Sequence, residues 1–125
     1  MRNILVRGLE RYRGLDGMSD LDRIRKLRKG EPYRLWKRGS RPTQIRPGDR
    51  VFLVSEEKVV GSCKFEKVDE NDHGPDKNGN PHNGPAIVVL GPFSPQNPPV
   101  PVPSNLLGRG WGWKYVPEEL EPKLR

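Results

Sequence analysis

The sequence predicts a mainly β protein with one or two short helices, folded as a pseudo-barrel. Its apolar residues gather in short runs, most clearly at 50–54, 58–65 and 86–90. The 14 glycines and 14 prolines of the 125-residue chain separate these runs and supply turns. Since a nearly closed barrel leaves few strand edges exposed, it suits a chain built from several short strands and a single helix.

The first third of the chain predicts one strand and one helix. A short apolar run within residues 2–8 is typical of a strand. Ser19 and Asp22 form a variant of the capping box, which satisfies free N–H groups at a helix start. Gly30 and Pro32 end that helix. Its apolar stripe, which would pack on the sheet, consists of Leu21, Ile24 and Leu27.

Strands are expected in five further segments. Alternation and aromatic content predict a strand at 32–39. Residues 50–55 and 58–68 predict a hairpin joined at its tip by two glutamates. The continuous apolar segment 86–90 is typical of a strand buried on both faces, and 110–116 is expected to close the barrel.

We expect residues 1–125 to form one domain, with surface loops at 69–85 and 91–104. The first of these segments is polar and rich in turn residues, and the second is rich in proline. A chain of this length has room for one hydrophobic core.

Basic residues are concentrated before position 51. Residues 1–50 hold 15 basic and 6 acidic side chains, whereas 51–125 hold 8 and 10. A polarised positive charge attracts polyanions, so RNA or DNA is the expected partner. A solvated helix face is the alternative for part of this charge.

Other partners and cofactors find little support. No run is long enough for a membrane helix or a signal peptide, so we expect a cytoplasmic protein without a membrane partner. Cys63 is the single cysteine and is expected to be a buried structural thiol. His73 and His82 lie in a polar segment without a cysteine pair, so neither a metal nor another cofactor is expected. The oligomeric state stays open.

Two clusters of aromatic and basic residues are the candidate binding sites. In 32–39, alternation puts Arg34, Trp36 and Arg38 on one face, where an indole can stack on a base and guanidinium groups can hold phosphates. In the closing strand, Trp111 and Trp113 share a face. The alternative is that these indoles fill the core. The complete expected nucleic-acid-binding set is Arg34, Trp36, Lys37, Arg38, Arg41, Lys64, Arg109, Trp111, Trp113 and Lys114.

The helix adds a third, weaker candidate. Helical spacing spreads its cations over an exposed face that could contact a phosphate backbone without reading sequence. These residues are Arg23, Arg25, Lys26, Arg28 and Lys29.

Several segments together resemble the PUA-like superfamily, which includes the ASCH and EVE domains. The motifs are RPGDRVFLV followed by KVVGSCKFEKV, with KGEPYRLWKRGSRP upstream and GRGWGWKYV downstream. The resemblance spans roughly residues 19–116 and implies a pseudo-barrel whose cleft takes RNA or a modified base. Some ASCH proteins hydrolyse amides of acylated cytidines, and others are linked with nuclease activity. The amidohydrolase pattern places Lys and Thr after a glycine, but alignment on Gly30 puts Pro32 and Tyr33 there.

We therefore expect a binding module and not an enzyme. A nuclease or nucleoside amide hydrolase using Lys37, Lys64 or Glu66 is one alternative. A protein–protein adaptor of phage or mobile-element origin is another, in which the basic face would bind an acidic host protein.

Overall fold

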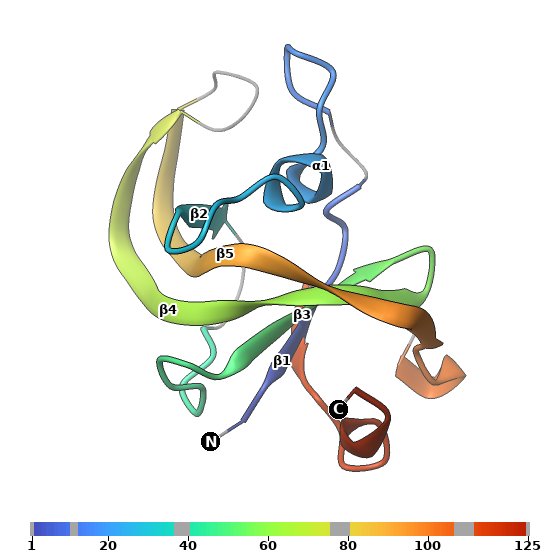
Figure 1. Ribbon diagram of the computed structural model, residues 1–125. Helices are drawn as coiled ribbons and strands as arrows, with labels where there is room; N and C mark the ends of the chain where they lie inside the picture. The colour runs from blue at the N-terminus through green and yellow to red at the C-terminus, as the bar shows by residue number, and fades with distance from the viewer. Residues whose placement is uncertain (1, 11–12, 37–40, 76–80, 107–111, 125) are drawn as a thin grey trace.

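The computed structural model has the mainly β fold predicted from the sequence. It describes residues 2–10, 13–36, 41–75, 81–106 and 112–124. All six strands belong to one sheet, in the order β2-β5-β4-β3-β1-β6. The sheet curls into a half-barrel, and helix α1 lies in its concave side (Figure 1). The elements are β1 (Ile4–Val6), α1 (Asp20–Ile24), β2 (Pro32–Trp36), β3 (Arg50–Ser55), β4 (Lys58–Pro75), β5 (Pro81–Pro101), the 3-10 helix η1 (Ser104–Leu106), β6 (Trp113–Tyr115) and the 3-10 helix η2 (Glu121–Leu124).

Most of the expected strands are present. Residues 110–111 of the expected closing strand and 37–39 of the strand expected at 32–39 lie outside the described residues, and β6 itself covers 113–115. β1 pairs in parallel with β3 and antiparallel with β6, so the two ends of the chain meet in the sheet. The hairpin of β3 and β4 turns at Glu56 and Glu57, both with positive φ. β5 is buried from Ala86 to Val89, as its apolar run predicts.

The two segments expected to be surface loops are largely strand, and this prediction is wrong. β4 and β5 form one long bent hairpin, paired from Lys58 opposite Pro101 to Pro75 opposite Pro81. The register shifts at several places along it, which lets two long strands bend. Prolines are tolerated in β5 because β2 pairs with it only as far as Leu90. Beyond Leu90, the edge of β5 that faces away from β4 has no partner strand among the residues that the structure describes, so a missing backbone N–H group costs no hydrogen bond there. Residues 102–104 lie outside the strand.

Helix α1 is capped as predicted but ends earlier than expected. The Ser19 hydroxyl accepts a hydrogen bond from the Asp22 backbone N–H, and the Asp22 carboxylate accepts one from the Ser19 N–H, both at 3.1 Å. After Ile24 the chain tightens into turns. Gly30, with φ of 77°, then directs it toward β5.

Two apolar clusters hold the sheet, one on each face. The first joins α1 to the concave face and includes Cys63, which is fully buried as predicted. Burial raises the pKa of the Cys63 thiol to about 11, against a small opposing effect of Arg50. The second lies where the C-terminal segment covers the other face, and comprises Leu5, Phe52, Val54, Val59, Val102, Val116, Leu120 and Leu124. In the described part of the chain, no helix has the length and apolar character needed to span a membrane.

Candidate nucleic-acid interface

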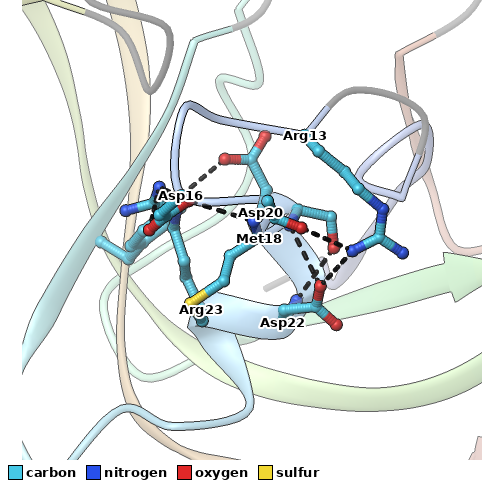
Figure 2. A network of polar contacts seen from close by, with 9 residues as sticks. Arg13, Asp16, Met18, Asp20, Asp22 and Arg23 are labelled. Atoms are coloured by element: carbon cyan, nitrogen blue, oxygen red, sulfur yellow. Dashed lines mark hydrogen bonds and ion pairs between the residues drawn. The ribbon is translucent and has the colours of Figure 1, made fainter.

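Two of the arginines near α1 form ion pairs. Arg13 donates to Asp22 at 2.9 Å and to the Gly17 carbonyl oxygen at 2.8 Å. Arg23 donates to both carboxylate oxygens of Asp16, at 2.8 and 2.9 Å. Figure 2 shows these contacts as one network beside the first turn of the helix. Arg23 therefore holds the segment before the helix through Asp16. Its helical position had suggested a contact with phosphate instead.

The other cations of this region are exposed. The structure records no side-chain hydrogen bond or ion pair for them. One contact places these cations next to β5. The Arg25 guanidinium lies over the ring of Phe93, 5.9 Å from the ring centroid. A second contact is made by the backbone, where the Gly30 N–H donates to the Gly91 carbonyl at 3.0 Å. The turn after α1 thus lies against β5. Its exposed cations are Arg25, Lys26, Arg28 and Lys29.

Three cations from separate elements line one pocket beside this turn. Lys29 comes from the turn, Arg50 from β3 and Lys64 from β4, and Arg50 and Lys64 are in register across the two strands. The pocket has a volume of about 370 Å³. None of the residues described along its wall is acidic. We call it the basic pocket; its remaining lining residues are Gly30, Leu90, Gly91, Pro92 and Ser94.

Arg50 is held in place within the basic pocket. Its Nε and Nη2 atoms donate to the Ser62 hydroxyl at 3.1 and 2.8 Å, and Nη2 also donates to the Ser62 carbonyl at 3.2 Å. Its backbone N–H donates to the Asn3 side chain at 2.8 Å. Since Ser62 is neutral, it orients the guanidinium without cancelling its charge, and the bond to Asn3 fixes the Arg50 backbone. A fixed cation loses less conformational entropy when an anion binds.

The residues of the expected binding set divide among several places. Lys64 lines the basic pocket. Arg34 is exposed on β2, two residues from Pro32, which is in register with Leu90 of that pocket. Alternation along β2 therefore puts Arg34 on the same face of the sheet as Lys64. Lys114 is half-buried in β6. The backbone of Trp36 pairs with Ala86. The side chain of Trp36 and the residues Lys37, Arg38, Arg109 and Trp111 lie outside what the structure describes.

Arg41 and Trp113 do come together, at a second pocket. Their neighbours there are apolar, contributed by Pro42, Val68, Pro85, Ala86 and Ile87. The volume is about 10 Å³, close to the space of one water molecule. A base could stack on Trp113 only after a side chain at the rim moved. Arg41 is also paired with Glu70, at 3.3 Å.

Trp113 is supported by its neighbour in β6. The ring of Tyr115 meets the indole edge-on, with centroids 5.1 Å apart. The Tyr115 hydroxyl accepts hydrogen bonds from the backbone N–H groups of Thr43 and Gln44 at 2.8 and 2.9 Å. Burial opposes ionisation of this phenol, but these bonds and nearby Arg2 together lower its pKa. The half-buried Trp113 is thus packed against the core and also lines the second pocket.

Comparison of the chain with protein-family models, curated proteins and solved structures found no significant match. The resemblance to PUA-like proteins therefore depends on the short sequence motifs.

Sequence reasoning missed one of the three cations of the basic pocket. Arg50 was not among the expected binding residues, because it begins a strand in which the next four residues are apolar. Its signal is present in the hairpin, where Lys64 lies in register with it once the irregularity between Leu53 and Val54 is included. Lys29 belonged only to the weaker helical candidate.

Proposed function

We propose that this protein binds RNA or DNA through a basic surface around residues 90–94 of β5. The surface comprises Arg25 beside Phe93, together with the three cations of the basic pocket. The observation that carries the proposal is the convergence of Lys29, Arg50 and Lys64 on a pocket without an acidic lining residue among those the structure describes. The like charges of these three side chains repel one another, and an anion bound among them would offset that repulsion by attraction. A polyanion would relieve that repulsion.

Phosphate contacts supply most of the affinity in this proposal. Three or four neutralised phosphates give log–log salt slopes between about −2 and −4. Arg34 would extend the contact along the same face of the sheet. Trp113 would add stacking where a displaced rim side chain admits a base. The PUA-like motifs favour RNA or a modified base as the ligand.

The test is a fluorescence-anisotropy titration of labelled single- and double-stranded RNA and DNA at about 50, 100 and 200 mM salt. The affinity of the wild-type protein should fall by about sixtyfold over this range, as a slope near −3 implies. The double variant Lys29→Gln/Lys64→Gln should bind about tenfold more weakly at the lowest salt and show a shallower slope. The control Lys58→Gln/Lys123→Gln removes the same charge from exposed sites outside the pocket.

Two outcomes would contradict the proposal. Wild-type protein without measurable binding at low salt would remove it. Equal loss in the two double variants would mean that net charge, and not the basic pocket, drives association.

The same samples address the alternative functions. Conversion of the labelled strand or of acylated cytidine during the titration, lost in Lys64→Ala, would indicate an enzyme. Capture of an acidic protein that persists after nuclease treatment would indicate an adaptor.

A further inference from the structure

We propose that the basic pocket binds a terminal phosphate monoester, the phosphorylated end of a nucleic acid, in preference to an internal phosphodiester. This inference rests on the proposed function and specifies which group the pocket takes. It follows from the charge, the preorganisation and the walls of the pocket.

The charge of the pocket exceeds what one phosphodiester can balance. Lys29, Arg50 and Lys64 bring three positive charges, and no lining residue that the structure describes brings a negative one. An internal phosphodiester carries one negative charge. A phosphate monoester carries about −1.5 to −2 at pH 7 and has three acceptor oxygens. The monoester is the better electrostatic match for three convergent cations.

The donors of the pocket are arranged for several oxygens at once. Arg50 has Nε and Nη2 engaged by Ser62, which leaves Nη1 for an anion. Lys29 and Lys64 are exposed, and the structure records no competing bond for either ammonium group. The exposed Ser94 hydroxyl is a further donor on the opposite strand. A guanidinium fixed by Ser62, together with two exposed ammonium groups that line the same pocket, can contact three oxygens of one phosphate.

One wall of the pocket is closed by bonded backbone. The Gly30 N–H donates to the Gly91 carbonyl at 3.0 Å, and the Gly91 N–H donates to the Glu31 carbonyl at 2.9 Å. A nucleic-acid strand that continues in both directions would need two openings in the pocket, whereas the end of a nucleic-acid strand needs only one. The volume of about 370 Å³ lies near the lower end of the roughly 300–1,000 Å³ typical of ligand pockets. Leu90 and Pro92 supply apolar contacts for a terminal sugar.

The experiment compares eight-nucleotide strands of one sequence carrying a 5′-phosphate, a 3′-phosphate or hydroxyls at both ends. We expect one phosphorylated strand to bind at least tenfold more tightly than the hydroxyl strand at pH 7.5. That preference should disappear in Lys29→Gln/Lys64→Gln and persist in Lys58→Gln/Lys123→Gln. It should also weaken severalfold at pH 5, because the second pKa of the phosphate is about 6.

Competition with a nucleoside 5′-monophosphate and with inorganic phosphate identifies the source of the group. If only unlabelled phosphorylated strand displaces the labelled strand, and neither the nucleotide nor inorganic phosphate does, the pocket is an end-binding site on nucleic acid. Displacement by the free nucleotide at equal concentration would overturn that assignment in favour of a nucleotide site. Equal binding of all three strands would overturn the end-binding proposal and leave nucleic-acid binding intact. Absence of binding by any strand would overturn both proposals.

Discussion

Substitution of Gly91 by alanine tests how the turn after α1 is held against β5. A Cβ atom at this position would overlap the Arg28 carbonyl oxygen and lie 2.7 Å from the Leu27 Cβ atom. It would also lie 3.1 Å from the Arg28 carbonyl carbon. Both Arg28 atoms belong to the backbone, so no rotamer change can move them away. The variant must therefore separate the turn from the strand.

The cost has two parts. Overpacking of a tight contact destabilises by about 1–3 kcal/mol. Separation also weakens the two backbone hydrogen bonds between Gly91 and the turn, each worth about 0.5–1.5 kcal/mol. The free energy of unfolding should thus fall by about 2–6 kcal/mol, a large part of the roughly 5–15 kcal/mol of a typical domain. At about 4 °C per kcal/mol, Tm should fall by roughly 8–24 °C.

Urea denaturation and thermal unfolding followed by circular dichroism measure this change. Gly30→Ala is the matched control, because Gly30 has φ of 77° but its added methyl group would meet no other atom within 4 Å. It should cost only the strain of a left-handed alanine, about 1–2 kcal/mol. A Gly91→Ala protein as stable as Gly30→Ala would refute the close approach described here. Since Lys29 lies beside Gly30, Gly91→Ala should also weaken anion binding in whatever fraction stays folded.

Three further predictions concern the core and the cap. Tyr33→Phe removes the 2.6 Å hydrogen bond to Asp20 and should lower the free energy of unfolding by about 1.5–3 kcal/mol in urea denaturation. The pKa of Asp22 is lowered, chiefly by the hydrogen bond from the Ser19 backbone, so the cap should stabilise above about pH 4 and lose its effect as pH falls through the lowered pKa. Asp22→Asn should therefore flatten the acid limb of the stability profile, unlike the exposed control Glu118→Gln. With a pKa of about 11, Cys63 should react with a disulfide reagent at pH 8 at least a hundredfold more slowly in native than in unfolded protein.

The parts of the fold that the sequence predicts are those governed by local signals. The capping box of α1, the apolar strand before Leu90 and the β3–β4 hairpin each depend on residues close together in the chain. The length of the β4–β5 hairpin does not. Residues 69–75 are polar and would not form a strand alone. They pair with β5, which the preceding part of β4 already holds in register. Cross-strand pairing thus outweighs the local preference for turns.

The arginines show why charge alone cannot define a site. Arg13 and Arg23 are as basic as Arg25, yet both are bound to carboxylates that follow or precede them by seven to nine residues. No helical or strand periodicity predicts these pairs, because the segment between Arg13 and Ser19 is an irregular loop closed by a single bridge. The positive charge available to a polyanion is therefore smaller than the count before position 51 suggests, and it lies closer to β5.

The basic pocket itself depends on one irregularity in the hairpin. Pairing continued without interruption from Ser55 opposite Lys58 would put Cys63 opposite Arg50. The shift between Leu53 and Val54 puts Lys64 there instead, and turns Cys63 to face Val51 in the core. A one-residue shift exchanges the two faces of a strand, so this shift alone decides whether a thiol or an ammonium group stands beside the guanidinium. Removing Val60 takes out the extra residue and leaves Lys64 opposite Arg50 in an uninterrupted ladder, so the deletion variant should keep its anion binding. A deletion variant that folded but no longer bound phosphorylated strands would show that placing Lys64 opposite Arg50 is not sufficient for the pocket.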